Sequence, residues 1–147
     1  MLLNIDPRKM VIVDLQEENE EKRSLYFPIA RAIELEKLHD GVSILKLISN
    51  DDIISSFNFI TNAYWCGLKT EDKTLTLQKT QSLISNVVEN VEDFDDYIKT
   101  LNGLTEGILK AFQATGLVGK PKEIDTPEEE KETPKKAGKP SKDSTVG

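Results

Sequence analysis

The stretch that decides the fold is DFDDYIKTLNGLTEGILKAF, which runs from Asp93 to Phe112. Its apolar residues recur at helical spacing along one side of the segment, and polar residues fill the positions between them. The apolar positions are Phe94, Tyr97, Ile98, Leu101, Leu104, Ile108 and Phe112. We expect a long helix that Asn90 caps, that has Glu92 and Asp93 in its first turn, and that ends around Gly116. Such a helix has to bury its apolar side against other elements.

The residues before this segment predict the partners for that apolar side. Pro28 suits the start of a helix that carries Ile29, Ile33, Leu35 and Leu38 and stops at Asp40–Gly41. A short apolar element follows over residues 42–48. Asp51 or Asp52 then caps a helix with Ile53, Phe57, Ile60 and Tyr64 on one side, and we expect Gly67 to end it. Thr74 or Thr76 caps the next helix, which carries Leu77, Ile84, Val87 and Val88.

Two β-branched and aromatic runs, Lys9–Leu15 and Arg23–Pro28, flank the charged turn Gln16–Lys22. This order predicts a β-hairpin, which needs a helical layer beneath it because a lone hairpin is marginal in water. We therefore predict a mainly α (α+β) fold over residues 1–118. It is a small helical domain of about five helices with an N-terminal β-hairpin.

Residues 119–147 differ from the rest of the chain in composition. They contain no aromatic residue and have Ile124, Ala137 and Val146 as their only aliphatic side chains. Such a segment cannot bury enough apolar surface to offset the entropy of ordering, so we expect a disordered tail. Its seven lysines and seven acidic residues cancel, which leaves the net charge of −7 on residues 1–118. An acidic domain argues against nucleic acid as a partner.

The sequence also indicates the cellular compartment of the protein. The start of the chain does not resemble a signal peptide, and no apolar run approaches the ~18 residues of a membrane span. The single cysteine excludes an intrachain disulfide and fits a reducing compartment. We expect a soluble cytoplasmic protein with no membrane partner.

Candidate chemistry is sparse. Cys66 and His39 each stand alone in the sequence, so a structural zinc site is excluded, and a Cys–His catalytic pair is the weakest of our hypotheses. Cys66 is expected at the end of a helix, where the dipole opposes thiolate formation. The acidic run Glu89–Asp96 lacks the order of a calcium loop, and the chain has no glycine-rich phosphate loop. The sequence predicts no enzyme activity and no cofactor.

Gly103, Gly107 and Ala111 recur at intervals of four residues in the last helix. They give a strip without bulky side chains, although each glycine costs a helix roughly 1 kcal/mol relative to alanine. One interpretation is close packing of another backbone, which makes these three residues candidates for contacts within an oligomer. The other is that the helix is weak or bends there.

The order of these segments resembles the tail assembly chaperones of long-tailed bacteriophages of Gram-positive hosts. The resemblance spans Ser24 to Phe112. It rests on the helix end Leu35–Gly41, on the aromatic–glycine segment Ala63–Leu68 with the charged turn and Leu75–Leu77 after it, and on Asp93–Phe112. These motifs mark helix ends and turns rather than chemistry.

The resemblance implies a role in phage assembly without catalysis, in the host cytoplasm. Proteins of this family bind the tape measure protein, keep it soluble and help tail tube subunits polymerise around it, and they are absent from the finished virion. Self-association is expected as well. The alternative is a structural tail protein or a head–tail joining protein. The candidate residues for binding the partner are aromatic, although for each of them the sequence favours a place in the core over a place in a binding groove: Tyr64, Trp65, Phe94, Tyr97 and Phe112.

Overall fold

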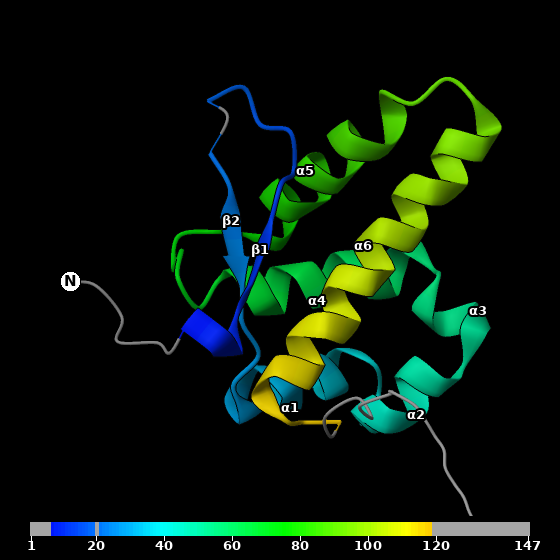
Figure 1. Cartoon of the computed structure of the whole chain (residues 1–147). Coiled ribbons are helices and arrows are strands. Elements are labelled where there is room, and N and C mark those ends of the chain that lie inside the picture. Colours follow the sequence, from blue (N-terminus) through cyan, green and yellow to red (C-terminus); the bar gives the residue numbers. More distant parts are fainter. Residues whose placement is uncertain (1–6, 20, 119–147) are drawn as a thin grey trace, which may run out of the picture.

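The computed structural model describes residues 7–19 and 21–118. In this part of the chain the mainly helical fold and the N-terminal antiparallel hairpin are confirmed. The predicted tail, residues 119–147, lies outside the described residues. The elements, shown in Figure 1, are the 3-10 helix η1 (Pro7–Lys9), strands β1 (Val11–Val13) and β2 (Arg23–Leu25), and helices α1 (Ile29–Leu38), α2 (Ile44–Ser49), α3 (Asp51–Ile54), α4 (Phe57–Leu68), α5 (Leu77–Glu89) and α6 (Phe94–Thr115).

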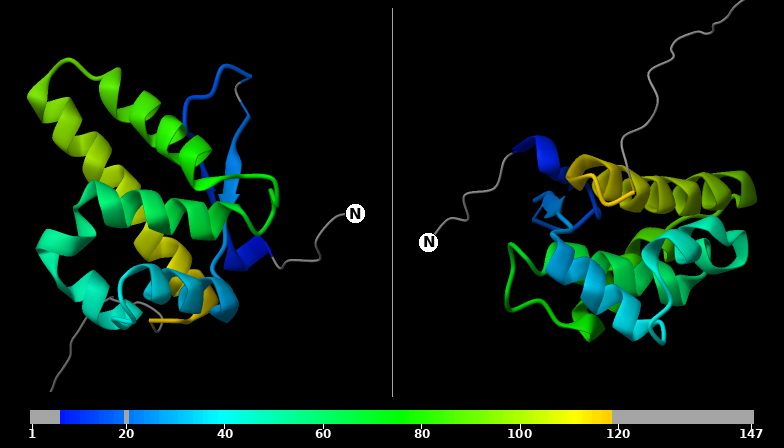
Figure 2. Two further views of the ribbon diagram at one scale, coloured as in Figure 1. Left: turned by 180° about the vertical axis from the view of Figure 1, so that it is seen from behind. Right: turned by 90° about the horizontal axis from the view of Figure 1, so that it is seen from below.

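Helix α4 is the centre of the molecule and packs against α1, α5, α6 and β2. Seen from below, α6 covers one side of the molecule while α1 and α2 lie on the other (Figure 2). Along α6 the buried side chains begin at Leu104, and Tyr97 and Leu101 before it are partly buried against the core. The largest fully buried side chains include Leu15, Leu25, Phe27, Leu35, Phe59, Ile60, Tyr64, Ile108 and Phe112.

Side-chain acceptors set where the helices begin. Thr76 caps α5 as predicted, because its hydroxyl accepts a hydrogen bond from the Lys79 amide. The prediction of Asn90 for α6 is wrong: Asp93 is the cap, and its carboxylate accepts from the Asp96 amide at 3.2 Å. Asn90 instead ends α5. The first-turn acidic residues of α6 are therefore Asp95 and Asp96, not Glu92 and Asp93.

The helix predicted to begin at Asp51 or Asp52 is two helices. Asn50 caps the short α3, and Ser56 starts α4 by accepting a hydrogen bond from the Phe59 amide at 3.1 Å. This restart breaks the helical phase between Ile53 and Phe57, and it places Phe57 in the first turn of α4. Its side chain is 47% exposed.

Gly67 was expected to end α4, but it lies inside the helix and is buried. A methyl group built at Gly67 would lie 2.6 Å from Leu25 Cδ1 and 2.8 Å from Phe27 Cζ. The hairpin therefore lies directly on α4 at this point, and the Tyr26 amide donates a hydrogen bond to the Gly67 carbonyl at 3.0 Å. Packing, not chain reversal, requires a glycine here. Chain reversal does require one at Gly41 and Gly116, whose φ angles are +79° and +81°.

Candidate partner-binding surface

The apolar side of α6 begins outside the core. Leu104, Ile108, Ala111 and Phe112 are buried, whereas Phe94 is 70% exposed and Ile98 is 39% exposed. Figure 1 shows why: the end of the molecule at which α5 turns into α6 projects beyond α4. Tyr97 is half-buried, and its ring lies 6.4 Å from that of Phe94 in a stacked arrangement. The first two turns of α6 therefore expose Phe94 and Ile98, while Tyr97 packs partly buried against the core.

A groove between α4 and α5 lies at the same end of the molecule. Its volume is about 230 Å³, and its lining combines Phe57 and Thr61 of α4 with Ile84, Ser85 and Val88 of α5. Exposed Phe57 forms one wall, and the buried side chains of Ile84 and Val88 form the floor. We call this groove together with Phe94, Tyr97 and Ile98 the α5–α6 end surface.

Acidic residues surround the α5–α6 end surface. Glu89 belongs to the groove, and exposed Glu92, Asp93, Asp95 and Asp96 follow along the turn into α6. Asp95 and Asp96 lie in the first turn of α6, where carboxylates are stabilised by the helix dipole. An apolar surface with an acidic rim matches a partner segment that has one apolar face and basic residues beside it.

Two of the five aromatic candidates are excluded from any surface. Tyr64 and Phe112 are 1% and 0% exposed, and the Phe112 ring packs 4.5 Å from that of Phe27. The Tyr64 hydroxyl donates a hydrogen bond to the Leu104 carbonyl at 2.8 Å, which joins α4 to α6. Burial raises the pKa of Tyr64 well above its ordinary value, so this hydroxyl stays protonated and keeps donating. Both residues stabilise the core rather than a complex.

Trp65 has a structural role near the opposite end of α4. Its indole Nε1 donates to the Leu75 carbonyl at 3.0 Å, and the Lys69 ammonium lies 3.6 Å from the ring centroid. Lys69 also pairs with Glu34 of α1. Trp65 therefore fixes the connection between α4 and α5, and it lies outside the α5–α6 end surface.

The strip of small residues on α6 separates into three environments. Ala111 is fully buried in the core. A methyl group built at Gly107 would lie 2.8 Å from the Tyr64 hydroxyl oxygen, so Gly107 makes room for the bond to Leu104. Gly103 has no atom within 4 Å of such a methyl group. Packing within the chain thus explains the small residues at Gly107 and Ala111. Of the three residues predicted to pack in an oligomer, Gly103 alone has no such contact.

Cys66 and His39 occupy separate apolar surroundings. Cys66 is fully buried, and burial together with Glu34 raises the pKa of the Cys66 thiol to about 12. Burial lowers the pKa of His39, whose ring lies 5.4 Å from that of Phe59 and contacts the Asn62 amide at 3.4 Å. A nucleophile needs the opposite shift of the thiol pKa. The hypothesis of a thiol enzyme thus finds no support in the surroundings of Cys66.

Within residues 7–19 and 21–118, no three His, Cys, Asp or Glu side chains come together as a metal site would require. Of the helices described, none has both the length and the apolar character needed to cross a bilayer.

Comparison with models of protein families, with curated proteins and with solved structures gives no match for this chain. The α5–α6 end surface is therefore a candidate binding site on the basis of its geometry alone. Sequence reasoning found Phe94 and Tyr97 but missed the groove and Phe57. The serine pair Ser55–Ser56 was the signal that could have shown a break before Phe57.

Proposed function

We propose that this protein is a phage tail assembly chaperone, a protein without catalytic activity that binds the tape measure protein and keeps it soluble in the host cytoplasm. The observation that carries the proposal is the α5–α6 end surface. It exposes Phe57, Phe94 and Ile98 around an apolar groove on a small acidic domain. The resemblance of residues 24–112 to tail assembly chaperones supplies the partner.

The groove suits an amphipathic helix better than an extended chain. It is bounded by two helices, α4 and α5, and α6 exposes two further apolar side chains one helical turn apart, Phe94 and Ile98. A partner helix that presents apolar residues at intervals of three and four positions can follow such a path. Lysine or arginine residues on that helix would meet Glu89, Asp95 and Asp96. This is the kind of segment that a long helical tape measure protein offers.

Coverage of such a segment explains the chaperone activity. A tape measure protein with unpaired apolar helical faces aggregates because those faces associate with one another. A chaperone that occupies each face with its own apolar surface and presents acidic residues to solvent prevents that association. Release then follows when tail tube subunits, the second partner, displace it along the tape measure protein.

Co-expression with the tape measure protein of the same phage tests the proposal. We expect the soluble fraction of the tape measure protein to rise several-fold with the wild-type chain. The double variant Phe57→Ser/Phe94→Ser should lose most of this effect, since both side chains are exposed in the free protein and their loss costs the fold little. The matched control is Ile29→Ser/Leu45→Ser, which removes two apolar side chains that are 68% and 65% exposed on α1 and α2.

Two results would contradict the proposal. One is a tape measure protein that stays equally insoluble with and without the chain. The other is the presence of the polypeptide in stoichiometric amounts in purified virions, measured by mass spectrometry, which would favour the structural tail or head–tail joining protein. Equal loss of activity in both double variants would show that the α5–α6 end surface is not the binding site.

A further inference from the structure

Residues 119–147 carry their charges in two blocks of opposite sign. The first block, residues 123–132, contains six acidic residues and one lysine, so its net charge is −5. The second block, residues 133–142, contains no acidic residue and four lysines: Lys135, Lys136, Lys139 and Lys142. The balanced total of this segment therefore conceals a basic block, which an acidic block separates from the helical domain.

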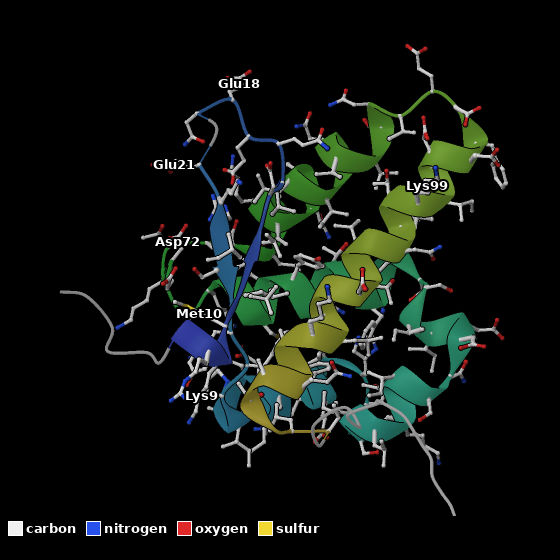
Figure 3. The ribbon with its side chains drawn as sticks, viewed as in Figure 1. Lys9, Met10, Glu18, Glu21, Asp72 and Lys99 are labelled. Atoms are coloured by element: carbon white, nitrogen blue, oxygen red, sulfur yellow. The ribbon has the colours of Figure 1, made fainter. Side chains whose placement is uncertain are left out.

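The acidic rim of the α5–α6 end surface consists of five carboxylates. All five are exposed and lie between the end of α5 and the first turn of α6: Glu89, Glu92, Asp93, Asp95 and Asp96. Within residues 7–19 and 21–118, none of them forms an ion pair with a lysine or arginine. Lys99, one turn later on α6, is the nearest cation in the sequence (Figure 3). A basic segment can therefore meet several carboxylates beside exposed Phe94 and Ile98.

The hairpin turn is acidic as well, but cations compensate much of its charge. Glu18 stands on the turn, and Asp72 lies to one side of the hairpin (Figure 3). Arg23 donates to Glu17 at 2.7 Å and to Asp72 at 3.0 Å. Lys79 also lines the hollow beside Glu17 and Glu18. The rim of the α5–α6 end surface is therefore the better match for a lysine-rich segment.

The chain is long enough to bring the basic block to this rim. Helix α6 has 22 residues, so about 33 Å separate the rim from the end of the helix at which residues 119–147 follow. Lys135 stands 17 residues beyond Val118, and a chain of that length spans at most about 56–61 Å. Because α6 forms one side of the molecule (Figure 2), a segment can return along its outer face.

We propose that the basic block, residues 133–142, docks on the α5–α6 end surface of its own chain and competes there with the partner helix. Its lysines meet the carboxylates of the rim, and their aliphatic stems lie against exposed Phe94. The block has no large apolar side chain, so it covers the rim and leaves the groove between α4 and α5 empty. This docking rests on the proposed function, since it regulates the surface that binds the partner.

Such docking makes the surface selective. A segment of the same chain has an effective concentration in the millimolar range, but exposed ion pairs are individually weak, so the block covers the rim for only part of the time. The apparent affinity of a competing partner falls by the fraction of molecules in which the surface is free, which we expect to be about two- to five-fold. A partner with basic residues alone is disfavoured, whereas one that also has an apolar face gains the groove and displaces the block.

Paramagnetic broadening in NMR spectra of the full chain tests where the block docks. A nitroxide attached to Ala137→Cys should broaden the amide signals of residues 92–98, and salt at 1 M should reverse the effect because the Debye length falls to about 3 Å. The native Cys66 is buried, so the label attaches at position 137. The control label, on Thr126→Cys in the acidic block, should leave residues 92–98 sharp. Broadening of residues 16–19 instead, or equal broadening from both labels, would overturn the proposal.

Calorimetric titration with a designed amphipathic peptide of leucine and lysine tests the competition. The variant Lys135→Gln/Lys136→Gln/Lys139→Gln/Lys142→Gln should bind the peptide about two- to five-fold more tightly than the wild-type chain at low salt, and this gain should vanish at 1 M salt. The matched control removes the same charge outside the basic block and should leave the affinity nearly unchanged: Lys73→Gln/Lys120→Gln/Lys122→Gln/Lys131→Gln.

Equal tightening in both quadruple variants would show an effect of net charge and overturn the proposal, as would unchanged binding of the first variant. Tape measure solubility is measured separately with the wild-type chain. Failure of that assay, with the broadening of residues 92–98 intact, contradicts the proposed function alone. A soluble tape measure protein, with no tightening in the first variant, contradicts the docking alone.

Discussion

Alanine substitutions at Gly103 and Gly107 should change stability in opposite directions, although both glycines occupy the same helix. Alanine is favoured over glycine in a helix interior by about 1 kcal/mol, and this gain applies to both positions. At Gly103 nothing opposes it, because a methyl group there meets no atom within 4 Å. We expect Gly103→Ala to stabilise the protein by about 1 kcal/mol and to raise the melting temperature by roughly 3–5 °C.

At Gly107 the same methyl group would lie 2.8 Å from the Tyr64 hydroxyl oxygen. The ring must shift, and the buried hydroxyl loses its bond to the Leu104 carbonyl. An unsatisfied buried hydroxyl costs about 1–3 kcal/mol, and overpacking adds about 1–3 kcal/mol. After the gain in helix propensity, Gly107→Ala should destabilise the protein by about 1–5 kcal/mol.

Thermal and urea unfolding followed by circular dichroism measure both changes. Tyr64→Phe is the control, since it removes the hydroxyl that the new methyl group meets. In the Tyr64→Phe background the cost of Gly107→Ala should fall by at least about 1 kcal/mol, which is the coupling of a double-mutant cycle. An increase in melting temperature for Gly107→Ala, equal to that for Gly103→Ala, would refute the reasoning.

Three further predictions follow from the same packing. Gly67→Ala should destabilise by about 1–2 kcal/mol in urea unfolding, because its methyl group meets Leu25 and Phe27 in the core; an unchanged midpoint would contradict this. Burial holds the pKa of His39 in the folded protein below 6.5, so the unfolded chain takes up the proton first as the pH falls. The free energy of unfolding should therefore decrease as the pH drops from 7 through 6. His39→Gln should reduce this decrease, and an equal decrease in both proteins would count against it. Cys66 should resist a thiol reagent at pH 8 until the protein is unfolded, since burial raises its pKa to about 12, whereas labelling of the native protein at the denatured rate would show that the thiol is accessible.

Local patterns were sufficient for the helices, because each signal lies within the segment that it describes. The apolar spacing of Leu104, Ile108 and Phe112 identified the buried side of α6, and the end of α6 at Gly116 is confirmed. Among several possible caps close together in the sequence, the choice depends on backbone geometry. That is why the sequence predicts Asn90 where the cap is Asp93, and Asp51 or Asp52 where α4 begins at Ser56.

Contacts between distant residues could not be read in the same way. Gly67 stands before a charged turn and looks like a helix end, but its role depends on Leu25 and Phe27, some forty residues earlier. The partner surface had the same limit. An apolar stripe shows that Tyr64 and Phe94 belong to helices, but only the place where α6 leaves the core decides that Tyr64 is buried and Phe94 is exposed.

Trp65 gives the protein an optical probe at a known place. It is the only tryptophan in the chain, so its fluorescence reports on one indole, which is held by the Leu75 carbonyl and covered by Lys69. Phe57 lies eight residues earlier on α4, about 12 Å along the helix axis. Unfolding should therefore shift the emission to longer wavelength, while occupation of the α5–α6 end surface should leave it nearly unchanged. One spectrum can then separate a partner that binds the folded domain from a partner that opens it.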